Sequence, residues 1–199
     1  MKYLVISDIH GSAESLEKVL CSFAESADFI ILCGDYLNHG PRNPLPEGWN
    51  PKKTAELLNA RKEKIICVRG NCDSEVDEMV LEFPCLAAYT TVLDCGRRIF
   101  VHHGHLYDRA KLENWLPKGT LILSGHTHVT VMEKSGGSIS GAPGDGQEEK
   151  GFCYFNPGSI SLPKGEEGKT FGMVEITGEG EAKISLYSVE GRLLRSLDF

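Results

Sequence analysis

Five short segments of this sequence carry side chains that can bind divalent metal ions. They are Asp8-Ile9-His10, Gly34-Asp35, Gly70-Asn71, His102-His103 and Gly125-His126-Thr127-His128. Together they supply carboxylate, amide and imidazole groups, a mixed oxygen and nitrogen set that suits a pair of divalent transition metals. Each segment follows a short run rich in Val, Ile and Leu, and scattered structural histidines would not gather in this way. The pattern therefore predicts a metal site rather than inert buried polar residues.

Two of these segments place ligands two residues apart. Asp8 and His10, and likewise His126 and His128, would point to one side of an extended chain and grip one ion together. Asp35 carries two carboxylate oxygens and can bridge two ions. Each pattern alone is a weak signal, but the set in this order, with every member at a strand end, is a strong one.

The elements that position these segments can be predicted from hydrophobic periodicity. We predict buried strands at 3–7, 29–33 and 65–68, a helix through Leu16 and Phe23 with Ser12 as its cap, and a second helix opened by Asn50-Pro51. This β-α-β-α-β order implies right-handed parallel crossovers with helices covering the sheet. Ligands of such sheets bind outside the carboxyl ends of the strands, which is where the metal-binding segments fall.

The second half of the chain predicts a further sheet. Short strands are expected at 99–102 and 121–123, a helix around 108–116, and hairpin-like strands at 129–133, 152–155, 171–176 and 183–189, the last with a mostly wet outer face. We therefore predict a single α/β domain over 1–199, with two mixed sheets flanked by helices. The Gly-, Ser- and Glu-rich segment 135–150 is expected to be a flexible loop without chemistry.

Composition narrows the function classes. The 199 residues carry a formal charge of −7, which argues against long nucleic acid and against anionic membrane surfaces as partners. The sequence shows no apolar run of membrane-spanning length and no secretory signal pattern. Its seven cysteines form no C-x-x-C pair, and their number is odd. We therefore expect a reduced, cytoplasmic protein.

The motif order resembles the signature of the calcineurin-like metallophosphoesterase superfamily, which runs D-x-H, GD, GN, a strand-end H and G-H-x-H. Within that superfamily the chain is similar to small bacterial phosphodiesterases over about 2–175. The segments that carry this likeness are SDIHGS (7–12), LNHGPRN (37–43), VRGNCDSEVD (68–77), HGHL (103–106), GHTH (125–128) and FNPGSISLPKG (155–165). The main departure is 135–150, a longer hairpin tip than such a chain would be expected to carry.

The resemblance implies a four-layer α/β/β/α sandwich and two divalent metal ions, with Mn²⁺ expected and Fe²⁺, Ni²⁺ and Zn²⁺ as alternatives. One ion would be bound by Asp8, His10, Asp35 and His128, and the other by Asp35, Asn71, His103 and His126. The implied reaction is hydrolysis of small phosphodiesters by a hydroxide that bridges the two metals. Two divalent ions more than offset the two aspartates, so the site would attract a phosphoryl group despite the acidic chain.

The residue after Asn71 bears on proton transfer. Many members of the superfamily have a histidine there that assists the leaving group, whereas this chain has Cys72. A neutral thiol, with a reference pKa of about 8.5, is a poorer positioned acid than an imidazolium. His105, His39 or a metal-bound water could take over, and we hypothesise a preference for good leaving groups. The alternative is that Cys72 only packs beside Asn71.

Several neighbouring residues have open roles. Arg42 could clamp a phosphate or be a solvated loop residue, and Asn38 and His39 are near enough to line the pocket. Asp73 could orient His103 or His10, or serve only in a turn. His102 should face the opposite side of its strand. The turn-like segment Asn156-Pro157-Gly158-Ser159 is expected to support the site from below.

Two other functions compete with the phosphodiesterase. A protein-interaction scaffold could keep the fold without turnover, as the retromer scaffold subunit does, but that subunit departs at some ligand positions that are intact here. A nuclease is disfavoured by the acidic charge and the lack of a basic stripe, although short nucleotides stay open as substrates. Self-association into a homo-oligomer is a further expectation.

Overall fold

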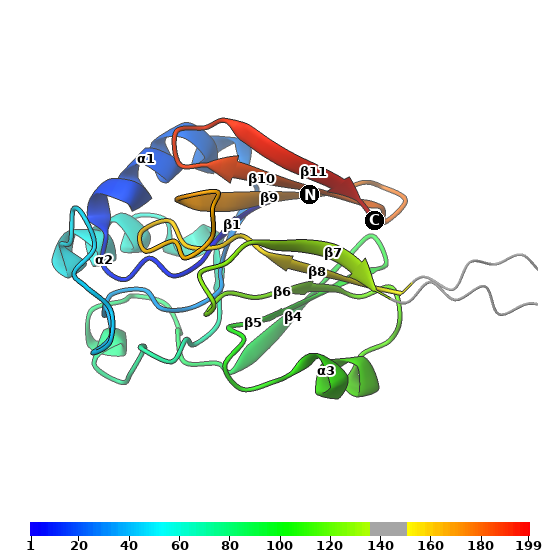
Figure 1. Ribbon diagram of the computed structural model, residues 1–199, viewed down its shortest axis with the longest axis horizontal. Helices are drawn as coiled ribbons and strands as arrows, with labels where there is room; N and C mark the ends of the chain where they lie inside the picture. The colour runs from blue at the N-terminus through cyan, green and yellow to red at the C-terminus, as the bar shows by residue number, and fades with distance from the viewer. Residues whose placement is uncertain (136–150) are drawn as a thin grey trace, which may run out of the picture.

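The computed structural model describes residues 1–135 and 151–199, which form two mixed β-sheets that pack face to face (Figure 1). The first sheet has the order β11-β10-β9-β1-β2-β3, with strands Leu193–Asp198, Ala182–Ser188, Thr170–Ile176, Lys2–Ile6, Phe29–Leu32 and Ile65–Cys67. The second has the order β4-β5-β6-β8-β7, with strands Tyr89–Asp94, Arg97–His102, Leu121–Leu123, Phe152–Asn156 and Val131–Ser135. Parallel pairing joins β1, β2 and β3 in one sheet and β5, β6 and β8 in the other.

Helices form the two outer layers. Helices α1 (Ala13–Phe23) and α2 (Pro51–Asn59) pack on the first sheet, and α3 (Arg109–Trp115) packs on the second (Figure 1). Short 3₁₀ turns occur at Ala24–Ser26, Lys62–Lys64 and Asp77–Met79. Three apolar clusters fill the three spaces between these layers. The predicted four-layer α/β/β/α sandwich is therefore confirmed.

Strand β1 shows why the sequence forms this core. Leu4 and Ile6 belong to the cluster beneath the helices, whereas Tyr3 and Val5 belong to the cluster between the sheets. A strand that is buried on both faces needs a continuous apolar run rather than an alternating one. The run that predicted a buried strand thus lies in the centre of the sandwich.

The two predicted helix starts have different outcomes. Asn50 caps α2 as predicted, because its side-chain oxygen accepts a hydrogen bond from the Lys53 amide at 3.0 Å. Ser12 precedes α1 but makes no side-chain cap, so that part of the prediction is wrong. Its hydroxyl instead donates to the Glu47 carbonyl at 2.7 Å and ties the β2–α2 loop to the start of α1.

Sequence reasoning missed two strands and misplaced one boundary. Strand β4 and the edge strand β11 were not predicted, and Ser135 ends β7 rather than beginning a loop. The rest of the predicted loop at 135–150 lies outside the described residues. On β10 the outer face is drier than predicted, because the Phe23 ring of α1 lies 5.1 Å from the Tyr187 ring. Within the described ranges, no helix has the length and apolar character needed to cross a membrane.

Candidate metal centre

All seven predicted metal ligands lie together at the carboxyl ends of the parallel strands. They come from the segments after β1, β2, β3, β5 and β6: Asp8, His10, Asp35, Asn71, His103, His126 and His128. Backbone hydrogen bonds hold neighbouring segments side by side, from the His10 amide to the Asp35 carbonyl at 2.9 Å and from the Gly125 amide to the His103 carbonyl at 2.8 Å. The position agrees with the sheet-edge site that the sequence predicts.

The backbone of these segments is unusual. Among the described residues, six non-glycine residues have a positive φ, and five of them are predicted ligands: Asp8, His10, Asp35, His126 and His128. L-residues adopt this left-handed region at a cost, and such strain gathers at functional sites. The paired ligands therefore converge through left-handed turns and not through the extended chain that the sequence analysis assumed.

Glycines in the GN and GH motifs allow the segments to approach closely. A Cβ atom on Gly70 would lie 2.0 Å from Oδ1 of Asp35, and one on Gly125 would lie 1.9 Å from Oγ of Ser7. No side chain fits at either position without moving a ligand segment. These glycines are thus part of the site although they contribute no ligand atom.

Asp8, His10 and His128 form a buried cluster, which we call the inner group. Nε2 of His128 lies 3.3 Å from Oδ1 of Asp8 and 3.2 Å from Nε2 of His10. Nδ1 of His10 donates to the Asn38 carbonyl at 2.8 Å, and Nδ1 of His128 donates to the Leu162 carbonyl at 2.6 Å. A neutral ring that donates through Nδ1 has a lone pair at Nε2, so two lone pairs face each other.

A cation would stabilise these facing donor atoms. Oδ1 of Asp8 is buried and has no hydrogen-bond partner, whereas Oδ2 accepts from Ser7 Oγ at 2.6 Å and from the His126 amide at 3.0 Å. One oxygen is thus oriented by the protein and the other is directed at two imidazole nitrogens. Buried polar atoms without partners call for an explanation, and a divalent ion among these three donors supplies one.

Asn71, His103 and His126 form a second cluster, the outer group. Oδ1 of Asn71 lies 3.1 Å from Nε2 of His103 and 2.6 Å from Nδ1 of His126. Nδ1 of His103 is bonded to the Cys33 carbonyl at 2.7 Å, which leaves Nε2 directed into the site. Although burial opposes it, the Asp35 carboxylate raises the pKa of His103 to about 9, so this position also favours positive charge.

Asp35 lies between the two groups. Its Oδ2 is 3.7 Å from Nε2 of His10 and 3.5 Å from Nε2 of His103. Oδ1 accepts a hydrogen bond from the Cys72 amide at 2.8 Å. Although burial acts in the other direction, the contact with His103 lowers the pKa of Asp35, and the carboxylate is ionised. This is the placement that a bridging ligand requires.

Cys72 is a further potential metal donor. Its sulfur and one ligand atom each of Asp35 and His10 all lie within 4.8 Å of one another. Burial and the adjacent Asp35 carboxylate raise the pKa of the Cys72 thiol to about 12. Metals bind the thiolate, which this environment disfavours. The neutral amide nitrogen of Asn71 lies 3.2 Å from the sulfur, so the thiol also packs beside Asn71.

Asp73 has a role that sequence reasoning missed. Its carboxylate accepts hydrogen bonds from the amides of Asp35, Tyr36 and Gly70 at 2.8, 2.8 and 2.7 Å. No hydrogen bond joins it to His103 or to a histidine elsewhere in the described chain. Burial and the nearby Asp35 raise the pKa of Asp73 to about 7, while the three amide donors act in the opposite direction. Asp73 thus orients the backbone of Asp35 rather than a ligand ring.

The segment after β8 supports the centre from below, as the sequence predicts. Ser159 and Ser161 donate to the Asp8 carbonyl at 2.7 and 3.0 Å, and Nδ2 of Asn156 donates to the Gly125 carbonyl at 2.7 Å. Both ligand-bearing turns are therefore fixed by one loop. Ser159 ends the segment predicted for this role, whereas Ser161 was not singled out, although it belongs to the FNPGSISLPKG segment.

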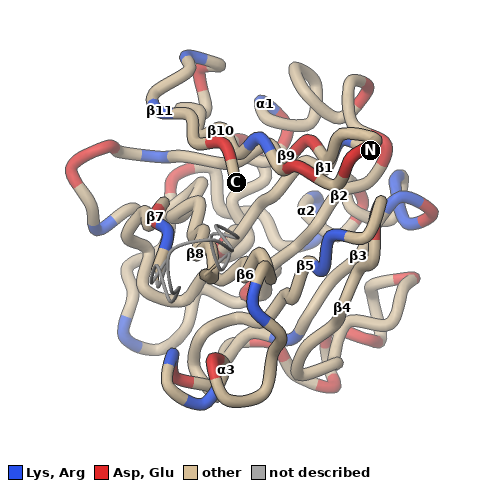
Figure 2. Tube along the Cα trace, turned by 90° about the vertical axis from the view of Figure 1, so that its right-hand side faces the viewer, with Lys and Arg blue, Asp and Glu red and all other residues tan. Residues whose placement is uncertain are grey.

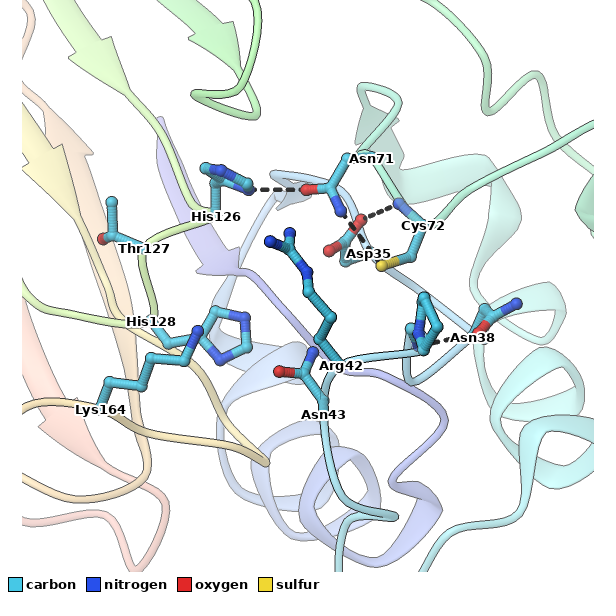
Figure 3. A pocket seen from close by; sticks show the side chains of 12 residues that line it. Asp35, Asn38, Arg42, Asn43, Asn71, Cys72, His126, Thr127, His128 and Lys164 are labelled. Carbon is cyan, nitrogen blue, oxygen red and sulfur yellow. Dashed lines mark hydrogen bonds between the residues drawn. The ribbon is translucent and has the colours of Figure 1, made fainter.

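A cavity of about 820 Å³ opens in front of the centre (Figure 3). Its walls comprise Asp35, Asn38, Gly40, Pro41, Arg42, Asn43, Asn71, Cys72, His126, Thr127, His128 and Lys164. Three of the predicted catalytic or substrate-binding residues are among them, namely Asn38, Arg42 and Cys72. Lys164 and Thr127 also line it. Both lie in segments that carry the resemblance, FNPGSISLPKG and GHTH, but sequence reasoning gave neither residue a role.

The other two predicted catalytic residues lie outside this lining. The His105 ring is 5.3 Å from the His103 ring and 6.0 Å from the His126 ring, so it flanks the outer group. The His39 ring packs against Trp49 at 6.0 Å. His102 faces the opposite side of β5, where burial lowers its pKa to about 4.

Comparisons with known proteins give a consistent result. The calcineurin-like phosphoesterase superfamily domain matches residues 1–179. Phosphodiesterase YfcE of Escherichia coli K12 is 45% identical over 176 residues, which cover 88% of each chain. The solved structure of the E. coli phosphoesterase YfcE has a TM-score of 0.83 at 39% identity and covers 99% of this chain and 98% of its own. Vps29 of Entamoeba histolytica complexed with Zn²⁺ covers 100% of this chain and 99% of its own, with a TM-score of 0.61 at 19% identity, and shows the fold alone.

Proposed function

Because the chain belongs to the calcineurin-like phosphoesterase superfamily, whose members are metal-dependent phosphoesterases, we propose that it hydrolyses small phosphodiesters at a centre of two divalent metal ions. The observation that carries this proposal is the convergence of imidazole lone pairs on the unpartnered Oδ1 of Asp8 and on the ionised Asp35. Both carboxylates are buried, and metal ions are the groups that such a set stabilises.

The proposed ligand sets follow from the two groups. The inner group with Asp35 holds one ion, through Asp8, His10, Asp35 and His128. The outer group with Asp35 holds the other, through Asp35, Asn71, His103 and His126. When bound, the ions supply Lewis acidity and activate water for in-line attack on the phosphoryl group. The carboxylate, amide and imidazole donors fit Mn²⁺, which is our first choice, and also Fe²⁺, Ni²⁺ and Zn²⁺.

Two side chains of the cavity, Arg42 and Asn38, are proposed to bind the reacting phosphoryl group. Arg42 extends from the β2–α2 loop into the cavity, where its guanidinium can hold phosphoryl oxygens (Figure 3). Asn38 belongs to the same loop and also lines the cavity. Cys72 retains its proton, because burial and Asp35 raise the pKa of its thiol to about 12. It is a weak acid for a departing alkoxide, so the enzyme favours esters with good leaving groups.

A proton donor for poorer leaving groups must come from elsewhere. We favour His105 over His39, because the His105 ring flanks the outer group whereas the His39 ring packs against Trp49. His105 is only half-buried, and burial together with the neighbouring His103 lowers its pKa.

Substrate size and cellular setting complete the proposal. Lys and Arg are interspersed with Asp and Glu over the described trace instead of gathering in one stripe, which disfavours long nucleic acid (Figure 2). All seven cysteines are free, which suits a reducing compartment such as the cytoplasm. Self-association into a homo-oligomer remains part of the proposal.

Hydrolysis of bis-p-nitrophenyl phosphate and of p-nitrophenyl phosphate by metal-stripped protein tests the reaction. Mn²⁺, Zn²⁺, Ni²⁺ and Mg²⁺ are added back one at a time. We expect diester turnover well above monoester turnover, restored by Mn²⁺. The scaffold alternative shares the fold, but all seven ligand positions are filled by ligand residues here. Absence of turnover with every metal would overturn the enzyme proposal in favour of that scaffold.

A further inference from the structure

The cavity in front of the metal centre is larger than one phosphoryl group requires. Its volume is about 820 Å³, and only its floor consists of predicted ligands. Beyond Cys72 and Thr127, which adjoin predicted ligands, the remaining wall comes from the loop at 38–43 and from Lys164 in the β8–β9 loop. The ester groups of the substrate therefore have a defined place, and the residues of this wall determine which ester groups fit.

Two cationic side chains on this wall have no acidic partner. Arg42 and Lys164 are both exposed, and neither makes an ion pair or a side-chain hydrogen bond with any described residue. Lys169, in the same loop as Lys164, shows the contrast, because it is bonded to Glu47 at 2.9 Å. The only acidic residue in the lining is Asp35, which the metal centre uses. The wall thus carries positive charge within an acidic protein.

The Arg42 and Lys164 side chains both come from backbone segments that are held by hydrogen bonds. The Lys164 amide donates to the carbonyl of His128 at 2.9 Å, so the lysine is fixed next to a predicted ligand. In the opposite loop, Asn43 donates to the His39 carbonyl at 2.9 Å, and Asn38 accepts from the Gly40 amide at 2.8 Å. The two side chains enter the cavity from different sides, Arg42 from the β2–α2 loop and Lys164 from the β8–β9 loop (Figure 3).

The positive charges around the cavity are more than a simple phosphodiester requires. A dialkyl or diaryl phosphate carries a single negative charge, which the metal centre and Arg42 already meet. We propose that Lys164 binds a second anionic group, a phosphate or a carboxylate, on one ester substituent of the substrate. The preferred substrates are then phosphodiesters with an additional negative charge. This inference rests on the proposed function, and it makes Lys164 a specificity-determining residue.

Matched esters with one leaving group test the inference. We compare p-nitrophenyl carboxyethyl phosphate with p-nitrophenyl methoxyethyl phosphate, which has a similar size and no second charge. A third ester carries a phosphate on its ethyl group in place of the carboxylate. It shows which of the two anionic groups Lys164 binds better. For the Mn²⁺-loaded wild-type protein we expect KM to be about tenfold lower for the two esters that carry a second anionic group, as one charged hydrogen bond provides. Added salt should reduce this preference.

Variants separate specificity from structure. Lys164→Gln should abolish the preference and leave kcat/KM for the methoxyethyl ester within about twofold of wild type. Lys164→Arg should keep most of it. Lys183→Gln is the matched control, since Lys183 is an exposed lysine on β10 that does not line the cavity.

Two results would overturn the inference. One is equal KM values for charged and uncharged esters with the wild-type protein. The other is an equal loss for both esters in Lys164→Gln, which would place the lysine at the reacting phosphoryl group. A failure of the proposed function looks different, because the wild-type protein would then hydrolyse none of the esters. Equilibrium titration with carboxyethyl methyl phosphate would in that case still show whether Lys164 binds the second anion.

Discussion

The inner and outer groups of the metal centre use similar donors in different environments. Asp8 and His10 are fully buried, and His128 is 3% exposed. In the outer group, His103 is also buried, but Asn71 is exposed and His126 is half-buried, and the last two line the cavity. Water and substrate thus reach the outer group more readily than the inner group, of whose three residues only His128 lines the cavity. We infer that the inner position holds its ion tightly, whereas the outer position exchanges its ion and meets the substrate.

Asp35→Asn gives the largest expected effect, because Asp35 serves both groups. The amide carries no charge and cannot bridge two ions, so diester turnover should fall on the order of 1,000-fold. Metal content measured by mass spectrometry should fall with it. Asp198→Asn, at an exposed carboxylate near the C-terminus, is the control and should keep wild-type activity. Wild-type turnover in Asp35→Asn would show that the inner and outer groups do not depend on Asp35 as a shared ligand.

His10→Ala and His126→Ala test the two groups against each other. Each should lower turnover more than about 100-fold, since even residues that only orient a ligand cost 10- to 100-fold. The metal content should distinguish them. His126→Ala is expected to retain one tightly bound ion per chain after dialysis, whereas His10→Ala should lose the tight ion. Equal stoichiometry and affinity in the two variants would show that burial does not separate the positions.

Asp73→Asn tests the support of Asp35. The variant weakens the acceptor that holds the amides of Asp35, Tyr36 and Gly70, so turnover and metal affinity should each fall about 10-fold. Asp77→Asn is the matched control, because Asp77 is a buried carboxylate of the same loop that binds the Ser74 amide instead. If both variants lost activity equally, general destabilisation of the loop would explain the result rather than the placement of Asp35.

The sequence could predict roles that depend on neighbouring residues, but not roles that depend on contacts between distant parts of the chain. The proposed ligands could be identified because their types and spacing are local, and the buried strands before them are continuous apolar runs. Lys164 and Ser161 were not, because their roles depend on contacts with His128 and Asp8, which are far away in the chain. Strand β11 was missed since an edge strand is half-exposed and lacks a buried run. Similarly, no local pattern reveals that Asp73 binds three amides.

Cys72→His is expected to change the ratio of two ester substrates rather than the metal content, and it replaces the residue that follows Asn71 of the outer group. An imidazole after Asn71 can donate a proton to the leaving group, a role for which the Cys72 thiol, with its pKa raised to about 12, is poorly suited. We expect hydrolysis of an alkyl ester to rise about 10-fold relative to an aryl ester of the same phosphate, because only the alkoxide needs protonation. Cys72→Ser controls for loss of the thiol and should leave the ratio unchanged. An unchanged ratio in Cys72→His, with metal content intact, would show that residue 72 only packs beside Asn71, and that proton transfer belongs to His105 or to water.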